Sequence, residues 1–204
     1  SKGQGLVPEM MALLRCWHPG VDVGELKEIV LRDGVIGRAT ALRVNDIVGR
    51  IFAVRYLSEG GRSAENIKLL LDLGATERSL SQLFFLHAAR GHNILRDFVA
   101  EVYWGRVMAG SNEVTKQDAM DFVQVATNLG RISPPWSEST VARMARYLGT
   151  CLGDFGLAAK GRSGRREILP FDIKPLAALY LAYDLHFSGV GDRGVLEHRD
   201  WSLF

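Results

Sequence analysis

Basic and hydroxyl side chains with helical spacing lie in the second half of the sequence, between residues 131 and 170. This stretch carries seven basic residues against three acidic ones, although the formal net charge of the 204-residue chain is only +2. A helix would place Ser139, Arg143, Arg146 and Thr150 on one face. Such side chains suit contacts to phosphates and base edges from a helix in a DNA major groove. The spacing therefore predicts DNA contact, with a merely solvent-exposed helix face as the alternative.

A second group of cations follows that helix, around a glycine-rich turn. Residues 157–160 and 166–170 flank the sequence Gly-Arg-Ser-Gly at 161–164, a composition typical of a β-hairpin. The cations that this hairpin would bring to neighbouring phosphates are Lys160, Arg162, Arg165 and Arg166. The alternative is a basic loop that faces only solvent. A helix, a turn, a second helix and a basic hairpin in succession predict a winged helix-turn-helix.

A third basic group lies nearer the start of the chain, between residues 34 and 62, with five arginines against two acids. Arg38, Arg43 and Arg50 would flank the apolar face of one amphipathic helix. Asp46 stands among them and can pair along the helix, which favours an ordinary charged surface. We keep the three arginines as candidate DNA contacts.

Residue types that could support catalysis or metal binding are present, but without the spacing that such sites need. The sequence contains no phosphate loop, dinucleotide fingerprint, Gly-x-Ser-x-Gly elbow or paired-carboxylate nuclease pattern. Its five histidines show no metal-site spacing. We therefore expect a protein that is not an enzyme and that uses no metal, no cofactor and no small-molecule substrate.

The elements that position these side chains are expected to be helices, because apolar residues recur with the helical period over nearly the whole chain. The clearest helix is 137–155, where Ser137 can cap the first turn and a buried stripe runs along one face. Further helices are predicted at about 8–18, 22–33, 38–57, 63–73, 79–90, 93–109, 115–128 and 175–187. Asp22 is an expected N-cap of the second of these, and Thr115 with Asp118 three residues later resembles a capping box. The fold class is therefore all-α, with a small β-hairpin as its exception.

A cluster of turn residues, Gly-Ser-Asn at 110–112, marks the best boundary in the sequence. It divides the chain into two packed helical subdomains. Residues 1–110 form an N-terminal helical subdomain, and residues 111–204 form a subdomain that is similar to a winged helix and ends in an aromatic tail.

The tail is unusual because Trp201, Leu203 and Phe204 place three large apolar groups at a chain end. One interpretation is that they pack on helices of this chain. The other is that they form an exposed anchor for a partner protein, since large apolar and aromatic side chains dominate binding hot spots.

Composition and cysteine content indicate the type of protein and its compartment. The hydrophobic fraction of 47% and the charged fraction of 24% are ordinary for a folded protein. Cys16 and Cys151 are too few for a disulfide scaffold, which indicates free thiols in a reducing, cytoplasmic compartment. Apolar stretches stay well below the ~20 residues that cross a bilayer, so neither a membrane helix nor a signal peptide is predicted.

Several runs along the whole chain resemble one known family. They are QGLVPE at 4–9, LRDFVAEVYW at 95–104, PWSEST at 135–140, DFGL at 154–157 and LEHRDWSLF at 196–204. The chain resembles the BrxA family, small proteins encoded in bacteriophage exclusion (BREX) defence operons. The resemblance implies an all-helical protein with some similarity to the antitermination factor NusB, helix-turn-helix character, DNA binding and no enzymatic activity.

Residue pattern and resemblance together predict a non-catalytic component of a BREX-type phage defence system. Its partners would be double-stranded DNA, contacted through the basic helix and hairpin, and other BREX proteins. The alternative is an adaptor that assembles other defence components through its aromatic tail, without essential DNA contacts. RNA binding by analogy with NusB is a weaker, fold-level association.

Overall fold

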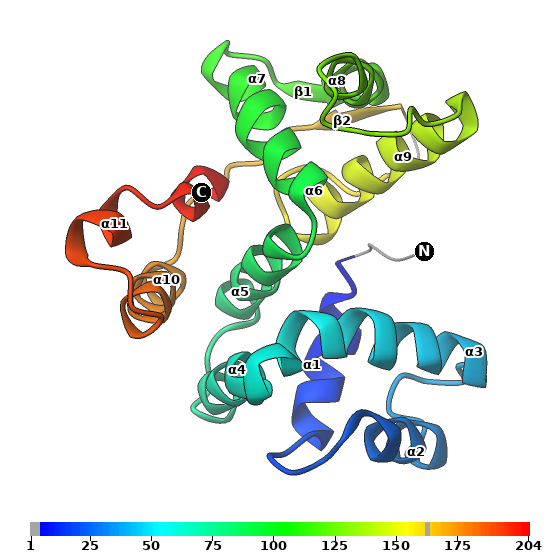
Figure 1. Ribbon diagram of the computed structural model, residues 1–204, viewed down its shortest axis with the longest axis vertical. Helices are drawn as coiled ribbons and strands as arrows, with labels where there is room; N and C mark the ends of the chain where they lie inside the picture. Colours follow the sequence, from blue (N-terminus) through cyan, green and yellow to red (C-terminus); the bar gives the residue numbers. More distant parts are fainter. Residues whose placement is uncertain (1–4, 162–163) are drawn as a thin grey trace. The chain divides into compact units, whose positions relative to one another are not determined.

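The computed structural model describes residues 5–161 and 164–204, without the side chain of residue 59. The protein is mostly helical, with a small two-stranded antiparallel sheet (Figure 1). Contacts divide the chain into two compact units. Unit 1 contains Ser1–Gly91 and Lys174–Tyr180, and unit 2 contains His92–Ile173 and Leu181–Phe204. Unit 2 holds the basic helix and hairpin of the sequence analysis.

Unit 1 is built from helices, one of which begins at the N-cap that the sequence predicts. Its elements are α1 (Val7–Cys16), α2 (Val23–Asp33), α3 (Ala41–Val44), the π-helix η1 (Asn45–Leu57), the 3-10 turn η2 (Ser58–Gly61), α4 (Arg62–Asp72) and α5 (Glu77–Arg90). The Asp22 carboxylate accepts the Glu25 N–H at 2.9 Å and begins α2. The predicted helix 38–57 instead begins at Ala41, because Thr40 caps it; Arg38 lies before it.

The core of unit 1 surrounds α5, where ten of fourteen residues are buried. The helix α10 (Pro175–Phe187) is joined to it. A hydrogen bond of 2.9 Å links His87 Nε2 to the Tyr180 hydroxyl. The Gln82 side-chain oxygen accepts the Lys174 N–H at 2.8 Å. The first turns of α10 therefore complete the core of a unit that lies far away in the sequence.

Arg55 in η1 departs from its expected placement. Its position on the apolar side of a helix suggested a side chain that reaches solvent or pairs with an acid. Instead Arg55 is only 7% exposed, and neither of its Nη atoms has a hydrogen-bond partner among the described residues.

Unit 2 begins with a continuous helical run formed by α6 (Asn93–Phe98), the π-helix η3 (Val99–Tyr103) and α7 (Trp104–Met108). The sequence assigned this run to residues 1–110, but it packs with the elements that follow it. The Tyr103 hydroxyl donates to the Leu157 carbonyl at 3.0 Å, and the Phe98 and Phe122 rings meet edge to face. Burial raises the pKa of Tyr103 to about 12.

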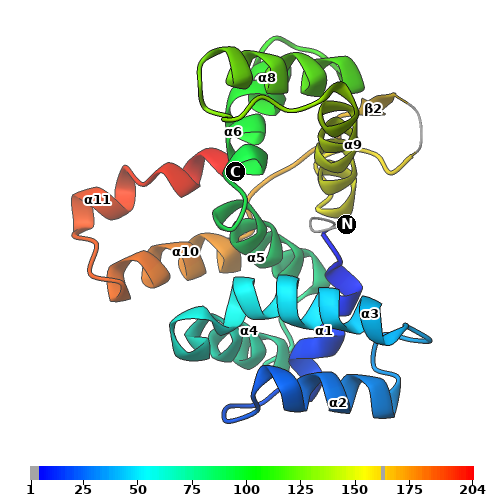
Figure 2. The same cartoon turned by 45° about the vertical axis from the view of Figure 1, so that its right-hand side comes forward.

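A helix pair and a small sheet form the other half of unit 2. The elements are β1 (Glu113–Thr115), α8 (Lys116–Asn128), α9 (Glu138–Asp154) and β2 (Arg165–Glu167). Helices α8 and α9 pack against each other (Figure 2). Strand β2 pairs antiparallel with β1, placing Val114 opposite Arg166, and an antiparallel bridge joins Ala158 to Ile168. The predicted hairpin is thus one part of a larger arrangement that includes β1.

The aromatic tail packs within unit 2. After α11 (Asp192–Leu196), the 3-10 turn η4 (Arg199–Leu203) contacts η3. Leu203 is fully buried, the Trp201 indole N–H donates to the Val195 carbonyl at 2.6 Å, and the Phe204 ring stacks on Phe171. Internal packing, the first interpretation of the tail, is therefore confirmed.

Candidate nucleic-acid interface and its cavity

The basic helix α9 separates a buried face from an exposed one. The Ser137 hydroxyl accepts the Thr140 N–H and begins the helix where the sequence predicts it. The buried stripe includes Val141, Ala145, Leu148, Cys151 and Leu152, as expected from the helical period. On the other side, Ser139, Arg143 and Arg146 are exposed. The exposure of these three side chains therefore follows from the helical period of this segment alone.

Two arginines on this face have no charged partner in the described part of the chain. Among the described residues, neither Arg143 nor Arg146 makes a side-chain hydrogen bond or an ion pair. Thr150 differs, because its hydroxyl donates to the Arg146 carbonyl at 2.8 Å within the helix. Its proton is thus already used, and only the oxygen lone pairs remain for a ligand.

The cations of the predicted hairpin have unlike environments. Lys160 is exposed and has no ion pair within the described part of the chain. Arg162 lies outside the described residues. Arg165 makes an ion pair of 2.9 Å with Glu113 of β1. Arg166 is half-buried, and its Nη1 donates to the Ala159 carbonyl at 3.1 Å.

Two glycines of α9 make room for Arg166. A Cβ added at Gly149 would lie 3.0 Å from the Arg166 Nε, and one at Gly153 would lie 3.3 Å from its Nη1. Glycine inside a helix costs about 1 kcal/mol relative to alanine. Here the absent side chains let the guanidinium lie across the helix, so Arg166 fixes β2 against α9.

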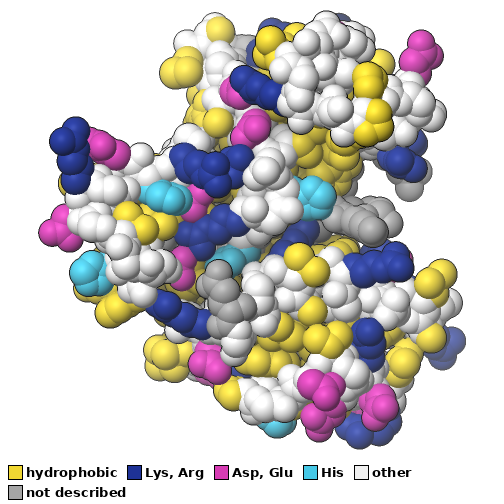
Figure 3. All heavy atoms as spheres, viewed as in Figure 1, with side chains coloured by type: hydrophobic (Ala, Val, Ile, Leu, Met, Phe, Trp, Pro, Cys, Tyr) yellow, Lys and Arg dark blue, Asp and Glu magenta, His cyan; other side chains and the backbone are white. Residues whose placement is uncertain are grey.

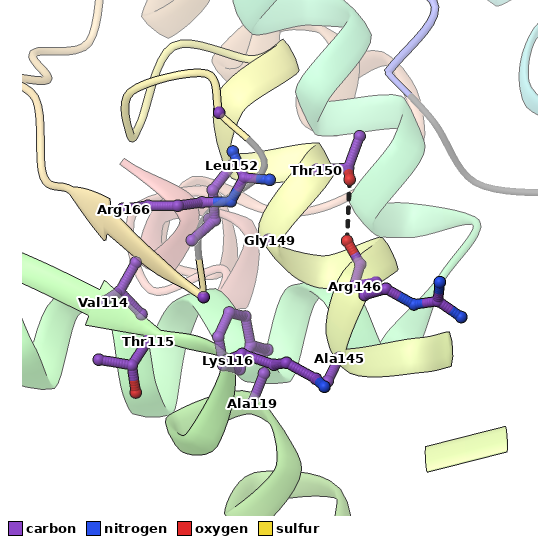
Figure 4. Close-up of a pocket in the computed structure, with 13 residues that line it drawn as sticks. Val114, Thr115, Lys116, Ala119, Ala145, Arg146, Gly149, Thr150, Leu152 and Arg166 are labelled. Atoms are coloured by element: carbon purple, nitrogen blue, oxygen red, sulfur yellow. Dashed lines mark hydrogen bonds between the residues drawn. The ribbon is translucent and has the colours of Figure 1, made fainter. Parts of the chain in front are cut away.

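A cavity of about 560 Å³ lies between β1, the start of α8, the middle of α9 and β2 (Figure 4). Among the described residues, three cations line it, namely Lys116, Arg146 and Arg166, and no carboxylate does. Its apolar lining is Phe98, Val114, Ala119, Ala145 and Leu152. Figure 4 shows the Lys116 and Arg166 side chains reaching toward α9, whereas the Arg146 guanidinium points away from them.

Lys116 is the functional candidate that sequence reasoning missed. It is the first residue of α8, and its backbone N–H donates to the Gly164 carbonyl at 2.6 Å. Its side chain has no ion pair among the residues described. The capping signal at Thr115 and Asp118 located the helix start, but nothing in the sequence placed this start beside α9.

A capping box holds the start of α8 in place. The Thr115 hydroxyl accepts the Asp118 N–H at 3.1 Å, while the Asp118 carboxylate accepts the Thr115 N–H at 2.8 Å. Arg106 of α7 also pairs with Asp118. Burial raises the pKa of Asp118, but the hydrogen bonds from Thr115 and Arg106 outweigh it and bring the pKa below its ordinary value. The Asp118 carboxylate is therefore ionised and already paired with Arg106, so it does not neutralise the Lys116 ammonium group.

The third basic group belongs to unit 1, whereas α9 and β2 belong to unit 2. Arg38 is exposed in a bend before α3, and Arg43 is half-buried in α3. Arg50 pairs with Asp46, with Nη1 and Oδ1 3.1 Å apart, as the helical spacing suggested. Of the three, Arg50 therefore has its charge partly neutralised within the chain.

Metal-binding and membrane-spanning features are both absent from the described residues. Within them, no group of three or more His, Cys, Asp or Glu side chains is placed to hold a metal ion. Likewise, none of their helices combines the length and apolar character needed to cross a bilayer.

Comparison with known proteins decides the family. The BrxA family model matches residues 1–183. The chain belongs to the BrxA family. Membership of BrxA implies a role in BREX phage defence, and the family is generally considered non-catalytic.

Among solved structures, the crystal structure of an uncharacterized protein from Magnetospirillum magneticum is similar in fold to this BrxA family member. The TM-score is 0.71 and the sequence identity 16%, with 91% of each chain covered. At this identity the likeness concerns the fold alone. Comparison with curated proteins finds no match.

Proposed function

We propose that this BrxA family member is a DNA-binding component of a BREX-type defence system and contacts duplex DNA through α9 and the segment around Lys160. The observation that carries the proposal is the exposed face of α9, where Arg143 and Arg146 have no charged partner among the described residues. A solvent-exposed helix usually interleaves cations with acids that pair with them. Unpaired guanidinium groups suit phosphates and guanine edges.

The order of elements in unit 2 supports this proposal. A helical run, β1, α8, α9 and two extended segments follow one another, and β2 lies between β1 and the segment at Ala158. This is the order of a winged helix-turn-helix, in which the second helix of the pair enters the major groove. By that comparison α9 is the recognition helix. The similarity to NusB stays a prediction.

The ion pairs limit which cations of the wing serve DNA. Arg165 is paired with Glu113, and Arg166 is held over α9. Lys160 is exposed beside them without an ion pair in the described chain. We therefore assign phosphate contact to Lys160 and a mainly structural role to Arg165. The proposal places the protein in the cytoplasm, where it meets DNA.

The test is charge reversal on α9, with a matched reversal in unit 1 as control. Replacing both Arg143 and Arg146 by Glu should weaken duplex binding at least about tenfold, because two phosphate contacts are lost. Thermal stability should hardly change, since exposed substitutions usually alter it by less than about 0.5 kcal/mol. The control, Arg15→Glu with Arg32→Glu, changes the net charge equally at two exposed arginines of unit 1 that are not candidate contacts. An equal loss in both variants would reflect net charge alone and would refute the α9 assignment.

An adaptor function is the second candidate, and an exposed aromatic pair favours it. The tail that first suggested this function packs within unit 2, with Leu203 buried, but Tyr183 and Phe187 of α10 are 60% and 65% exposed, and their rings stack at 6.0 Å. Figure 3 shows hydrophobic side chains at several points of the surface. Exposed apolar side chains that cluster often mark protein interfaces.

Co-purification separates the two functions. If the adaptor reading is right, Tyr183→Ser with Phe187→Ser should abolish co-purification with other BREX proteins and leave duplex affinity unchanged. Binding that weakens steeply with rising salt instead indicates phosphate contact. Duplex RNA and single-stranded DNA belong in the same assay, because tighter RNA binding would favour the analogy with NusB.

A further inference from the structure

The cavity in unit 2 combines a cationic rim with an apolar floor, and the DNA contacts proposed above do not require it. A volume of about 560 Å³ falls within the range of small-molecule sites. In the part of the chain that the structure describes, its charged lining residues are all cations, and the acid on the first turn of α8, Asp118, is already engaged by Thr115 and Arg106. We propose that this cavity binds a phosphorylated ligand of about mononucleotide size.

Two side chains have donors available for the phosphate. Lys116 has an ammonium group with three N–H donors and no ion pair within the described chain. Arg166 uses one guanidinium nitrogen for the Ala159 carbonyl, which leaves further N–H groups of its planar fork. Both reach toward α9 across the cavity (Figure 4). The pairing of a point charge with a fork is typical of phosphate recognition.

Arg166 is also held in position before any ligand arrives. Gly149 and Gly153 leave space on α9 for its side chain, and pairing with Val114 of β1 in the sheet fixes its backbone. A donor that is already ordered loses less conformational entropy on binding than a free surface side chain. This distinguishes Arg166 from Arg143, whose side chain lies in solvent.

The rest of the cavity suits the uncharged part of such a ligand. Phe98, Val114, Ala119 and Leu152 supply an apolar floor, and the Phe98 ring is held edge to face against Phe122 with centroids 5.5 Å apart. An inorganic anion would leave this floor uncovered. A planar base attached to the phosphate would cover it and exclude water.

The phosphorylated group could come from a free nucleotide or from one nucleotide unit of a bound nucleic acid. In either case the site can be tested apart from the proposed DNA contacts Arg143 and Lys160, because these two do not line the cavity, whereas Arg146 does and is left unchanged. Lys116 lines it but lies outside the exposed face of α9. Substitutions at Lys116 and at Arg143 therefore report on different sites.

The experiment is a calorimetric titration of the full chain with 5′-AMP, with inorganic phosphate and adenosine as the two halves of the probe. AMP should bind at least about tenfold more tightly than either half, a difference of about 1.4 kcal/mol. Lys116→Gln should weaken AMP binding about tenfold, whereas Arg143→Gln and Lys160→Gln should leave it unchanged. Lys116 is exposed, so its substitution should not disturb folding.

Each outcome decides a specific question. Absence of AMP binding at millimolar concentration, or equal affinity of Lys116→Gln and the unaltered chain, would overturn the proposal. Displacement of AMP by a DNA duplex would identify the ligand as a nucleotide unit of bound DNA, whereas simultaneous binding would identify a free nucleotide. A chain that binds AMP but no duplex would refute the proposed DNA contact and leave the cavity site intact.

Discussion

The Gly149→Ala substitution tests whether Arg166 is held across α9 by the absence of a side chain. Alanine is favoured over glycine inside a helix by about 1 kcal/mol. The new Cβ, however, would lie 3.0 Å from the Arg166 Nε, so the guanidinium must shift by a few tenths of an ångström, and we expect this shift to break its 3.1 Å bond to the Ala159 carbonyl. Losing a hydrogen bond from a charged donor costs about 1.5–3 kcal/mol. The loss outweighs the gain, and the expected net destabilisation is roughly 0.5–2 kcal/mol.

Gly105→Ala is the matched control. Gly105 lies in α7 of the same unit, and a Cβ there meets no atom within 4 Å. The Gly105→Ala substitution should raise Tm by about 2–4 °C, because in a chain of this size each kcal/mol of added stability raises Tm by about that much. Gly149→Ala should instead lower Tm by roughly 1–8 °C on the same scale. Thermal unfolding followed by circular dichroism measures both. An equal rise in Tm for the two variants would refute the structural role given to Arg166.

Three further predictions concern the interface, the tail and the cap. If Arg143, Arg146 and Lys160 contact phosphates, a plot of log affinity for duplex DNA against log salt should have a slope near −3. Lys160→Gln should make this slope less steep by about 0.9. An unchanged slope would show that Lys160 does not contact DNA. Leu203→Ala should destabilise the protein by about 2–5 kcal/mol, whereas Leu196→Ala, at a position 78% exposed, should have little effect on Tm. Because the folded-state pKa of Asp118 is lowered, its carboxylate stabilises the fold above the ordinary carboxyl pKa, and this contribution is lost as pH falls through the lower value. Urea titrations should therefore show Asp118→Asn less stable than the unaltered chain at pH 7, with the gap closing in acid; a gap independent of pH would contradict the role of the charge.

Helix α9 and its exposed face could be predicted from the sequence because every signal there is local. Ser137 caps the helix through a residue three positions away, and the helical period alone assigns Leu148 to the core and Arg143 to solvent. The same reasoning located the caps at Asp22 and Thr115. These predictions required no knowledge of tertiary contacts.

The cavity could not be predicted because its parts meet only through distant contacts. Strand β1 has three residues, too few for a period, and it pairs with β2 across about fifty residues of chain, where Val114 lies opposite Arg166. Without β1, nothing placed Lys116 near α9. The role of Gly149 was hidden for the same reason, since a glycine in a helix has no visible purpose until its tertiary neighbour is known.

Arg55 shows a second limit of local reasoning. The helical period puts it on the apolar side of its segment, and it is buried. The period does not show whether a partner reaches the guanidinium, and neither Nη atom has a hydrogen-bond partner among the described residues. A partner from another element can be found only once the tertiary contacts are known.

The division of α10 between the two units has a consequence for how this chain can evolve. Residues up to Tyr180 belong with unit 1, and those from Leu181 belong with unit 2. Recombination between related genes at a single crossover near Gly91 would pair a foreign α5 with the resident α10. The bonds from His87 to Tyr180 and from Lys174 to Gln82 would then join residues of different ancestry. Inheritance of a working unit 1 therefore requires two exchanged segments, and the halves of this protein are poorly suited to shuffling as independent modules.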